Sequence, residues 1–239
     1  MVLVFYSVAV VLAAWIGGAL PLLVRKQQVA IGFFISFGAG ILLGAALLHM
    51  LPDAASYIGP RLGGPALLGF LTLYIFEKFL LTHPCPSPTC DFHRVGISAF
   101  VGLSLHSLIT GLALGAGVLV PHLGGIIFLA ILMHKIPASL SLSSLLVREH
   151  YRTRTVALIV LIFSVMVPIG AALTYLFAEG MGGVVLGYLI AFSAGTFLHV
   201  AADDLVPEVH HALHHRNLRL VIFLGGIGLM WALRIVGAS

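Results

Sequence analysis

The stretch from Gly38 to Asp53, GAGILLGAALLHMLPD, aligns without gaps on the stretch from Ser193 to Glu208, SAGTFLHVAADDLVPE. In both copies small residues come first, apolar residues follow, and a proline with an acid directly after it ends the stretch. A shorter pair aligns His106–Leu112, HSLITGL, on His134–Leu140, HKIPASL. Internal repeats with polar residues inside apolar segments are typical of membrane carriers that work by alternating access.

The composition of the chain excludes a soluble domain. Of the 239 residues, 60% are hydrophobic and 8% are charged, and the mean hydropathy is +1.14; soluble proteins carry about 25% charged residues. One helical crossing of a bilayer core needs about 20 apolar residues. Eight stretches meet this requirement: 2–24, 29–51, 64–82, 95–119, 123–147, 155–178, 182–206 and 218–237. We therefore expect a single all-α, polytopic transporter domain over 1–239, with eight transmembrane helices in a lipid bilayer.

Basic residues near helix ends predict the orientation, because Lys and Arg collect on the cytoplasmic side. If the odd-numbered links share one side, nine basic residues lie there: Arg25, Lys26, Lys78, Arg94, Arg148, Arg152, Arg154, Arg216 and Arg219. Only Arg61 and Arg234 lie opposite. We therefore expect cytoplasmic loops at about 83–94, 148–154 and 209–217, with both termini outside. The long repeat is then inverted, in a 3+2+3 arrangement of helices, and the net charge of +4 reflects topology and not nucleic-acid binding.

Two histidines lie near the middle of adjacent expected helices, His106 in 95–119 and His134 in 123–147. A charged residue at mid-span costs about 2.5–3.5 kcal/mol, so its presence indicates function. Neutral imidazole binds zinc and similar divalent metals, and Thr110 projects from the same helical face as His106. We interpret these residues as a metal site, beside which Lys135 repels a second cation. The alternative is that each histidine only joins helices through a backbone carbonyl.

These motifs resemble those of the ZIP (Zrt/Irt-like) metal transporters. The run from His106 to Gly115 resembles the family's helix-4 signature, and His134-Lys135 resembles the helix-5 signature of its His-Lys subgroups. The stretches 193–208 and 49–53 are similar to parts of helices 7 and 2 of the family. The resemblance implies a carrier that moves a divalent metal, usually zinc, toward the cytoplasm through a site between helices 4 and 5. It also implies an elevator-like motion and a homodimer. The metal is then a substrate, and we expect no catalytic cofactor and no enzymatic activity.

The chain departs from the family pattern at the expected site. Members with two metals place acids on helices 4 and 5, where this chain has Thr110, Lys135 and Ala138, so we expect a single-metal site. A hydroxyl is a poorer ligand than a carboxylate. His199 is the candidate substitute for the missing acid, with Asp203 one turn later on the same face. The alternative is that His199 only packs against a neighbouring helix.

Acids gather at the expected cytoplasmic end of 182–206: Asp203, Asp204 and Glu208. The resemblance implies that positions 203 and 204 line the exit of the metal. His49 and Asp53 are the repeat counterparts of Asp204 and Glu208, and are expected near the outer face, where they can collect incoming metal. Glu77 precedes Lys78, and an ion pair between these neighbours is the simplest interpretation.

Two expected cytoplasmic loops contain further zinc-type ligands. The first loop has His83, Cys85, Cys90 and His93, and the second has His210, His211, His214 and His215. We expect these loops to bind metal after delivery, as a receiver or sensor. The alternative is that they are solvated loop residues.

The sequence is also compatible with other functions. A membrane metal sensor and an intramembrane metalloenzyme both fit the histidines, but neither requires an inverted repeat, and the His-Glu-x-x-His motif of zinc proteases is absent. A carrier working in the direction of efflux is a third possibility. The membrane of a prokaryotic cell and that of a eukaryotic organelle both fit the sequence, and the short loops favour the plasma or inner membrane of a prokaryote.

Overall fold

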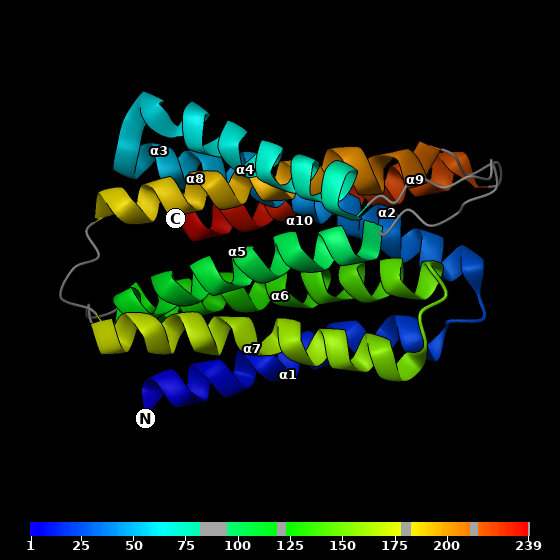
Figure 1. Ribbon diagram of the computed structural model, residues 1–239, viewed down its shortest axis with the longest axis horizontal. Helices are drawn as coiled ribbons and strands as arrows, with labels where there is room; N and C mark the ends of the chain where they lie inside the picture. The colour runs from blue at the N-terminus through cyan, green and yellow to red at the C-terminus, as the bar shows by residue number, and fades with distance from the viewer. Residues whose placement is uncertain (82–94, 119–122, 178–182, 211–214, 239) are drawn as a thin grey trace.

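The computed structural model describes residues 1–81, 95–118, 123–177, 183–210 and 215–238, and within these ranges it is all-helical, with no β-strand. The elements are α1 (Val2–Leu23), α2 (Gln28–Gly44), η1 (Ala45–Met50), α3 (Leu51–Ile58), η2 (Gly59–Leu62), α4 (Gly63–Ile75), η3 (Phe76–Leu81), α5 (Val95–Val118), α6 (Leu123–Arg148), α7 (Thr153–Phe177), α8 (Gly183–His199), η5 (Val200–Leu205), α9 (Val206–His210) and α10 (Arg216–Ala238). Figure 1 shows them as long, roughly parallel and antiparallel rods, with both termini at the same end.

Seven helical segments among the described residues are long and apolar enough to cross a membrane. One of them, Gln28–Phe79, has 52 residues, which is about 78 Å of straight helix and far more than a bilayer core of about 30 Å. The chain turns back within this segment at Gly59, where φ is +58°, a conformation that glycine adopts without a Cβ penalty. The chain is thus an integral, multi-pass membrane protein.

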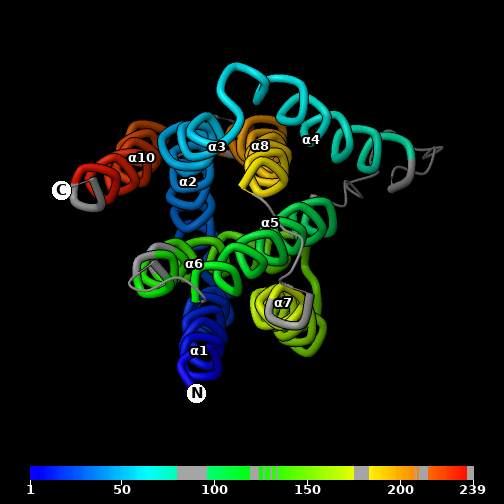
Figure 2. Tube along the Cα trace, turned by 90° about the vertical axis from the view of Figure 1, so that its left-hand side faces the viewer, coloured from blue at the N-terminus to red at the C-terminus, as the bar shows by residue number. Residues whose placement is uncertain are grey.

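The helices form two groups when viewed along their length (Figure 2). The first group contains α1, α5, α6 and α7, and the second contains α2 with α3, α4, α8 and α10. The groups meet where α2 packs on α6 and where α5 packs on α8. The expected site residues His106 and His134 are on α5 and α6, and His199 is on α8. The candidate metal ligands therefore lie near the junction between the two groups.

The helices α1 and α6 of the first group are packed very closely. A Cβ built on Gly17 would lie 2.3 Å from the carbonyl oxygen of Ile136, so only glycine fits at this crossing. Ser143 Oγ donates a hydrogen bond to the carbonyl oxygen of Gly18 over 2.7 Å. Small residues and serine hydroxyls are the usual means of joining helices in lipid.

Both copies of the long repeat contain a π-helical segment at the same place. These segments are η1 and η5, and each ends two residues before a proline, Pro52 or Pro207. The backbone N–H of Val206 donates to the carbonyl oxygen of Ala201, five residues back. A proline lacks an N–H and its ring crowds the carbonyl four residues earlier, which widens the preceding turn. The π-helical turn therefore has its cause in the repeated sequence.

Candidate metal sites

The two mid-membrane histidines face each other between α5 and α6. His106 Nε2 lies 3.3 Å from His134 Nε2, and His106 is buried. Zinc binds histidine nitrogen at about 2.0–2.1 Å in tetrahedral geometry, which places two nitrogen ligands of one ion about 3.3 Å apart. The pair therefore has the spacing of two ligands of one tetrahedral ion.

His106 is held in place by residues of α8. His106 Nδ1 lies 2.7 Å from Ser193 Oγ on α8, and the His106 ring packs on Phe197 with centroids 4.1 Å apart. Thr110 lies one turn after His106, and its hydroxyl donates to the carbonyl oxygen of Ser107 over 3.0 Å. Its oxygen retains lone pairs for a ligand, because a hydroxyl is both donor and acceptor.

Lys135 is buried beside the pair, with 1% of its surface exposed. Its Nζ donates to Ser107 Oγ over 2.9 Å and to the carbonyl oxygen of Phe163 over 3.3 Å, and it lies 3.6 Å from the centroid of the Phe163 ring. A cationic group held between α5, α6 and α7 in this way opposes the binding of a further cation nearby.

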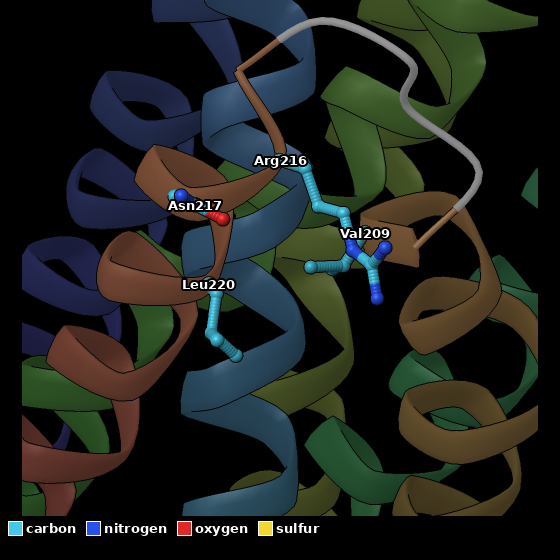
Figure 3. Close-up of a pocket in the computed structure, with 4 residues that line it drawn as sticks. All are labelled: Val209, Arg216, Asn217 and Leu220. Carbon is cyan, nitrogen blue, oxygen red and sulfur yellow. The ribbon is translucent and has the colours of Figure 1, made fainter.

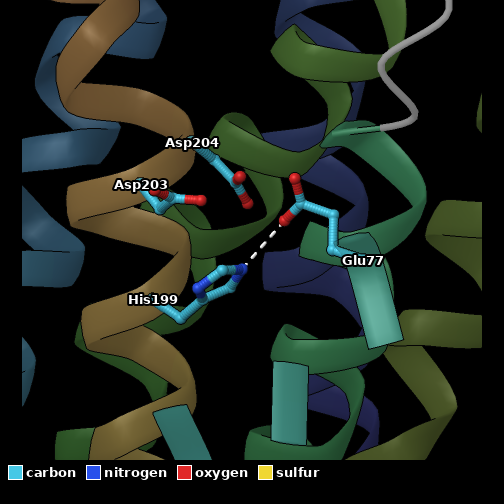
Figure 4. Close-up of side chains that lie close together, drawn as sticks. All are labelled: Glu77, His199, Asp203 and Asp204. Carbon is cyan, nitrogen blue, oxygen red and sulfur yellow. Dashed lines mark hydrogen bonds and ion pairs between the residues drawn. The ribbon is translucent and has the colours of Figure 1, made fainter. Parts of the chain in front are cut away.

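A second cluster joins η3 to the end of α8 and to η5 (Figure 4). Glu77, His199, Asp203 and Asp204 each offer one ligand atom, and these atoms all lie within 4.8 Å of one another. His199 Nε2 lies 2.8 Å from Glu77 Oε2. Imidazole and carboxylate together suit zinc, manganese, iron and similar divalent ions. The cluster can thus hold a divalent ion.

Some atoms of this cluster already contact a cationic group, and others have no hydrogen-bond partner among the described residues. Lys78 Nζ lies 2.9 Å from Glu77 Oε1 and 3.0 Å from Asp203 Oδ2, so an ammonium already bridges two of the carboxylates. His199 Nδ1 and Asp204 Oδ2 are buried, and among the described residues neither atom has a hydrogen-bond partner. Buried polar atoms without a partner are uncommon in folded proteins, and an ion is one group that can satisfy them.

Helix α5 connects the two sites. Ser98 Oγ donates to Glu77 Oε2 over 3.2 Å, and Ser98 precedes His106 by eight residues, which is about 12 Å along a helix. A Cβ on Gly102, midway between them, would lie 2.5 Å from Leu73 Cδ1 and 3.2 Å from Val200 Cγ2. The interval between the sites is therefore filled by apolar side chains in this structure.

The predicted site residues thus lie at separate places in the structure. It brings His106 and His134 together, with their Nε2 atoms 3.3 Å apart. It places His199 against Glu77, Phe70 and Tyr74, in one cluster with Asp203 and Asp204. His199 therefore lies in the second cluster, and its described contacts do not include the histidine pair.

The remaining predicted residues lie elsewhere. His49 Nε2 contacts the carbonyl oxygen of Met230 at 2.8 Å, and Asp53 Oδ1 accepts from Arg234 Nη1 at 2.6 Å, so both are bonded to α10. Glu208 and His210 belong to α9, and His215 packs edge-on against Phe33. The first loop cluster and part of the second lie outside the described residues: His83, Cys85, Cys90, His93, His211 and His214.

Glu77 is the site residue that the sequence interpretation missed. The expected ion pair with Lys78 is present, but Lys78 also contacts Asp203 and Glu77 also contacts His199. The signal was available, because an acid inside an expected membrane span is a functional candidate by default.

A hollow between α9 and α10 is separate from both clusters (Figure 3). It is lined by Val209, Arg216, Asn217 and Leu220. This lining offers neither imidazole nor carboxylate, so the hollow has no part in the metal chemistry.

Comparison with known proteins assigns the family. The family model described as ZIP Zinc transporter matches residues 86–234. The chain is 25% identical over 252 residues to zinc transporter ZIP9 of Xenopus tropicalis, covering 85% of this chain and 83% of that protein. It is 28% identical over 268 residues to zinc transporter ZIP1 of Danio rerio, covering 88% and 87%, and 25% identical over 265 residues to ZIP1 of Homo sapiens, covering 88% and 80%.

These relatives are animal proteins, so the expected prokaryotic membrane gains no support from them. Their names and the matched region agree with the resemblance in the motifs, since residues 86–234 include both members of the histidine pair. The match spans more than half of the chain, and the chain therefore belongs to the ZIP family of zinc transporters.

Proposed function

We propose that this chain carries zinc, or a chemically similar divalent ion, toward the cytoplasm through a single-metal site built on His106 and His134. The observation that carries the proposal is the 3.3 Å separation of the Nε2 atoms of a buried His106 and a half-buried His134, which matches two ligands of one tetrahedral ion. The named activity of the relatives, zinc transport, supports the same substrate. Thr110 is the third ligand of the proposal, and no catalytic step is part of it.

We propose that the second cluster is the next binding site of the metal on its way to the cytoplasm. Glu77, His199, Asp203 and Asp204 offer oxygen and nitrogen ligands at the end of α8 that the basic residues assign to the cytoplasm. Lys78 balances two of the carboxylates while no metal is bound. An arriving ion displaces this ammonium from the carboxylates, and the returning ammonium favours release of the ion.

An elevator-like movement of one helix group against the other is proposed for the transfer. The hydrogen bonds of α6 to α1 lie within the first group, and those of α3 and η1 to α10 lie within the second. At the contact between α2 and α6, Gly38 faces Ser141, whose hydroxyl donates to the carbonyl oxygen of Pro137 on its own helix. An interface of small residues whose polar groups are satisfied internally suits sliding.

The topology of the proposal has eight crossings, with the segment Gln28–Phe79 counted as two because the chain turns back at Gly59. In Figure 1, α2 leads to α3 at one end of the rods and α8 leads to α9 at the other. Their opposite directions and the matched π-helical segments support an inverted repeat. External termini and a homodimer complete the proposal, the latter from the resemblance to the family.

Flux in proteoliposomes tests the transport proposal. Liposomes loaded with a fluorescent zinc indicator receive the native chain, the His106→Ala/His134→Ala variant, or the matched control His215→Ala, which changes a histidine outside both clusters. We expect saturable zinc entry that the double variant abolishes and the control retains. Zinc binding without flux, unchanged by the double substitution, would contradict the carrier and favour a metal sensor.

A further inference from the structure

Among the described contacts, Ser193 is the residue of the opposite helix group that offers a polar atom to the histidine pair. Its Oγ lies 2.7 Å from His106 Nδ1, and its side chain is fully buried. Ser193 is on α8, whereas His106 is on α5 and His134 is on α6. The contact therefore crosses the junction between the two groups.

The chemistry of the histidine pair decides which atom donates in this contact. A neutral imidazole carries one proton, on either Nδ1 or Nε2. His106 Nε2 faces His134 Nε2 at 3.3 Å, and an ion between them needs a lone pair on both atoms. The proton of His106 must then be on Nδ1, and that N–H needs an acceptor. Ser193 Oγ is at hydrogen-bond distance and has lone pairs to accept it.

No alternative acceptor replaces Ser193 among the described contacts of the His106 ring. The other neighbours are Phe197, which offers an aromatic ring, and His134, which faces the opposite nitrogen. The hydroxyl of Thr196, on the same helix as Ser193, donates to the carbonyl oxygen of Ser193 over 2.8 Å. Loss of the Ser193 hydroxyl would leave a buried N–H without its partner.

We propose that Ser193 is a positioning residue, which accepts a hydrogen bond from His106 Nδ1–H and so presents the lone pair of His106 Nε2 to the transported ion. The inference rests on the proposed function, because it requires that His106 and His134 hold the metal. Groups that fix the tautomer of a metal-binding histidine typically change metal affinity by about 10–100-fold when they are removed. An effect of that size is expected here on the affinity for zinc.

The test compares Ser193→Ala with a matched control, Ser36→Ala. Ser36 is equally buried, on α2 of the same helix group, and its hydroxyl donates to the carbonyl oxygen of Gly32 within its own helix. Zinc flux in proteoliposomes gives KM and kcat for both. We expect Ser193→Ala to raise KM for zinc about 10–100-fold with little change in kcat, and Ser36→Ala to leave KM unchanged. Ser193→Cys, whose sulfur is a weak acceptor, should give an intermediate KM.

The outcomes separate this inference from the function on which it rests. If His106→Ala abolishes flux while Ser193→Ala keeps the native KM, the role of Ser193 is wrong and the site remains. If Ser193→Ala lowers kcat and leaves KM alone, Ser193 acts in the movement of the helices and the positioning role is again wrong. If His106→Ala itself leaves flux unchanged, the proposed metal site is wrong and the inference fails with it. Thermal unfolding checks that each serine variant is folded.

Discussion

Lys135 Nζ lies 3.6 Å from the centroid of the Phe163 ring. Its nearest hydrogen-bond acceptors are Ser107 Oγ and the carbonyl oxygen of Phe163. The ammonium is thus held by an aromatic face and two neutral oxygens in these contacts, next along α6 to the proposed ligand His134. This arrangement keeps a positive charge close to the proposed metal site, without a carboxylate among these contacts to neutralise it.

Removing this charge should tighten zinc binding. Like charges several ångströms apart repel by about 1 kcal/mol or more at an effective dielectric constant of about 20, and about 1.4 kcal/mol is a factor of ten. We expect Lys135→Met to lower KM for zinc about tenfold in the flux assay. Phe163→Leu keeps the charge while removing the ring, and serves as the control with a native KM. An unchanged or higher KM in Lys135→Met would contradict the electrostatic role of the ammonium.

The second cluster should control release more than binding. Glu77→Gln preserves the size of a buried side chain that contacts His199, Lys78 and Ser98, but removes its charge. We expect kcat for zinc flux to fall at least about tenfold, comparable to the loss of an outer-shell or ligand group at other metal sites, while KM stays within about threefold. Asp53→Asn, in an exposed ion pair with Arg234 on α10, is the control and should retain kcat. A changed KM with native kcat would place Glu77 in initial binding instead.

Close packing of α1 on α6 predicts a large stability effect at a glycine. In Gly17→Ala the new Cβ would meet the Ile136 carbonyl at 2.3 Å, and overpacking of this kind costs about 1–3 kcal/mol. The control is Gly225→Ala on α10, where nothing lies within 4 Å of the new Cβ. Alanine is favoured over glycine in a helix by about 0.5–1 kcal/mol, so this control should be neutral or stabilising. Unfolding curves of both variants in detergent give the comparison, and equal stability would mean that the α1–α6 crossing is looser than described.

The proposed orientation predicts the labelling of two exposed loop positions. In a Cys85→Ser/Cys90→Ser background, Arg61→Cys and Arg152→Cys each introduce one thiol at an exposed position. We expect a membrane-impermeant thiol reagent to label position 61 on intact cells and position 152 only after the cells are permeabilised. The reverse pattern would invert the topology and therefore the direction of transport assigned to the cluster around Glu77.

The helical class and the repeated segments follow from the sequence because they depend on local features. Apolar stretches of about 20 residues specify membrane helices, and Pro52 and Pro207 act on the turn directly before them. The partner of His199 could not be predicted in this way. It depends on how α4 packs along α8, which places Glu77 of η3 beside a residue more than one hundred positions later. The prediction that grouped His199 with His106 treated each helix separately and could not include this packing.

In the proposed elevator-like movement, the spacing of polar residues along α5 implies a length for the transport step. Ser98 now lies beside Glu77, and His106 lies eight residues further along the same helix. An advance of α5 by about 12 Å relative to α8 brings His106 to the height of Glu77, so the ion can pass from one set of ligands to the other without leaving protein donors. A shorter stroke would leave the ion to cross the apolar interval formed by Leu73 and Val200. The spacing of Ser98 and His106 on α5 therefore gives the distance that the proposed movement has to cover.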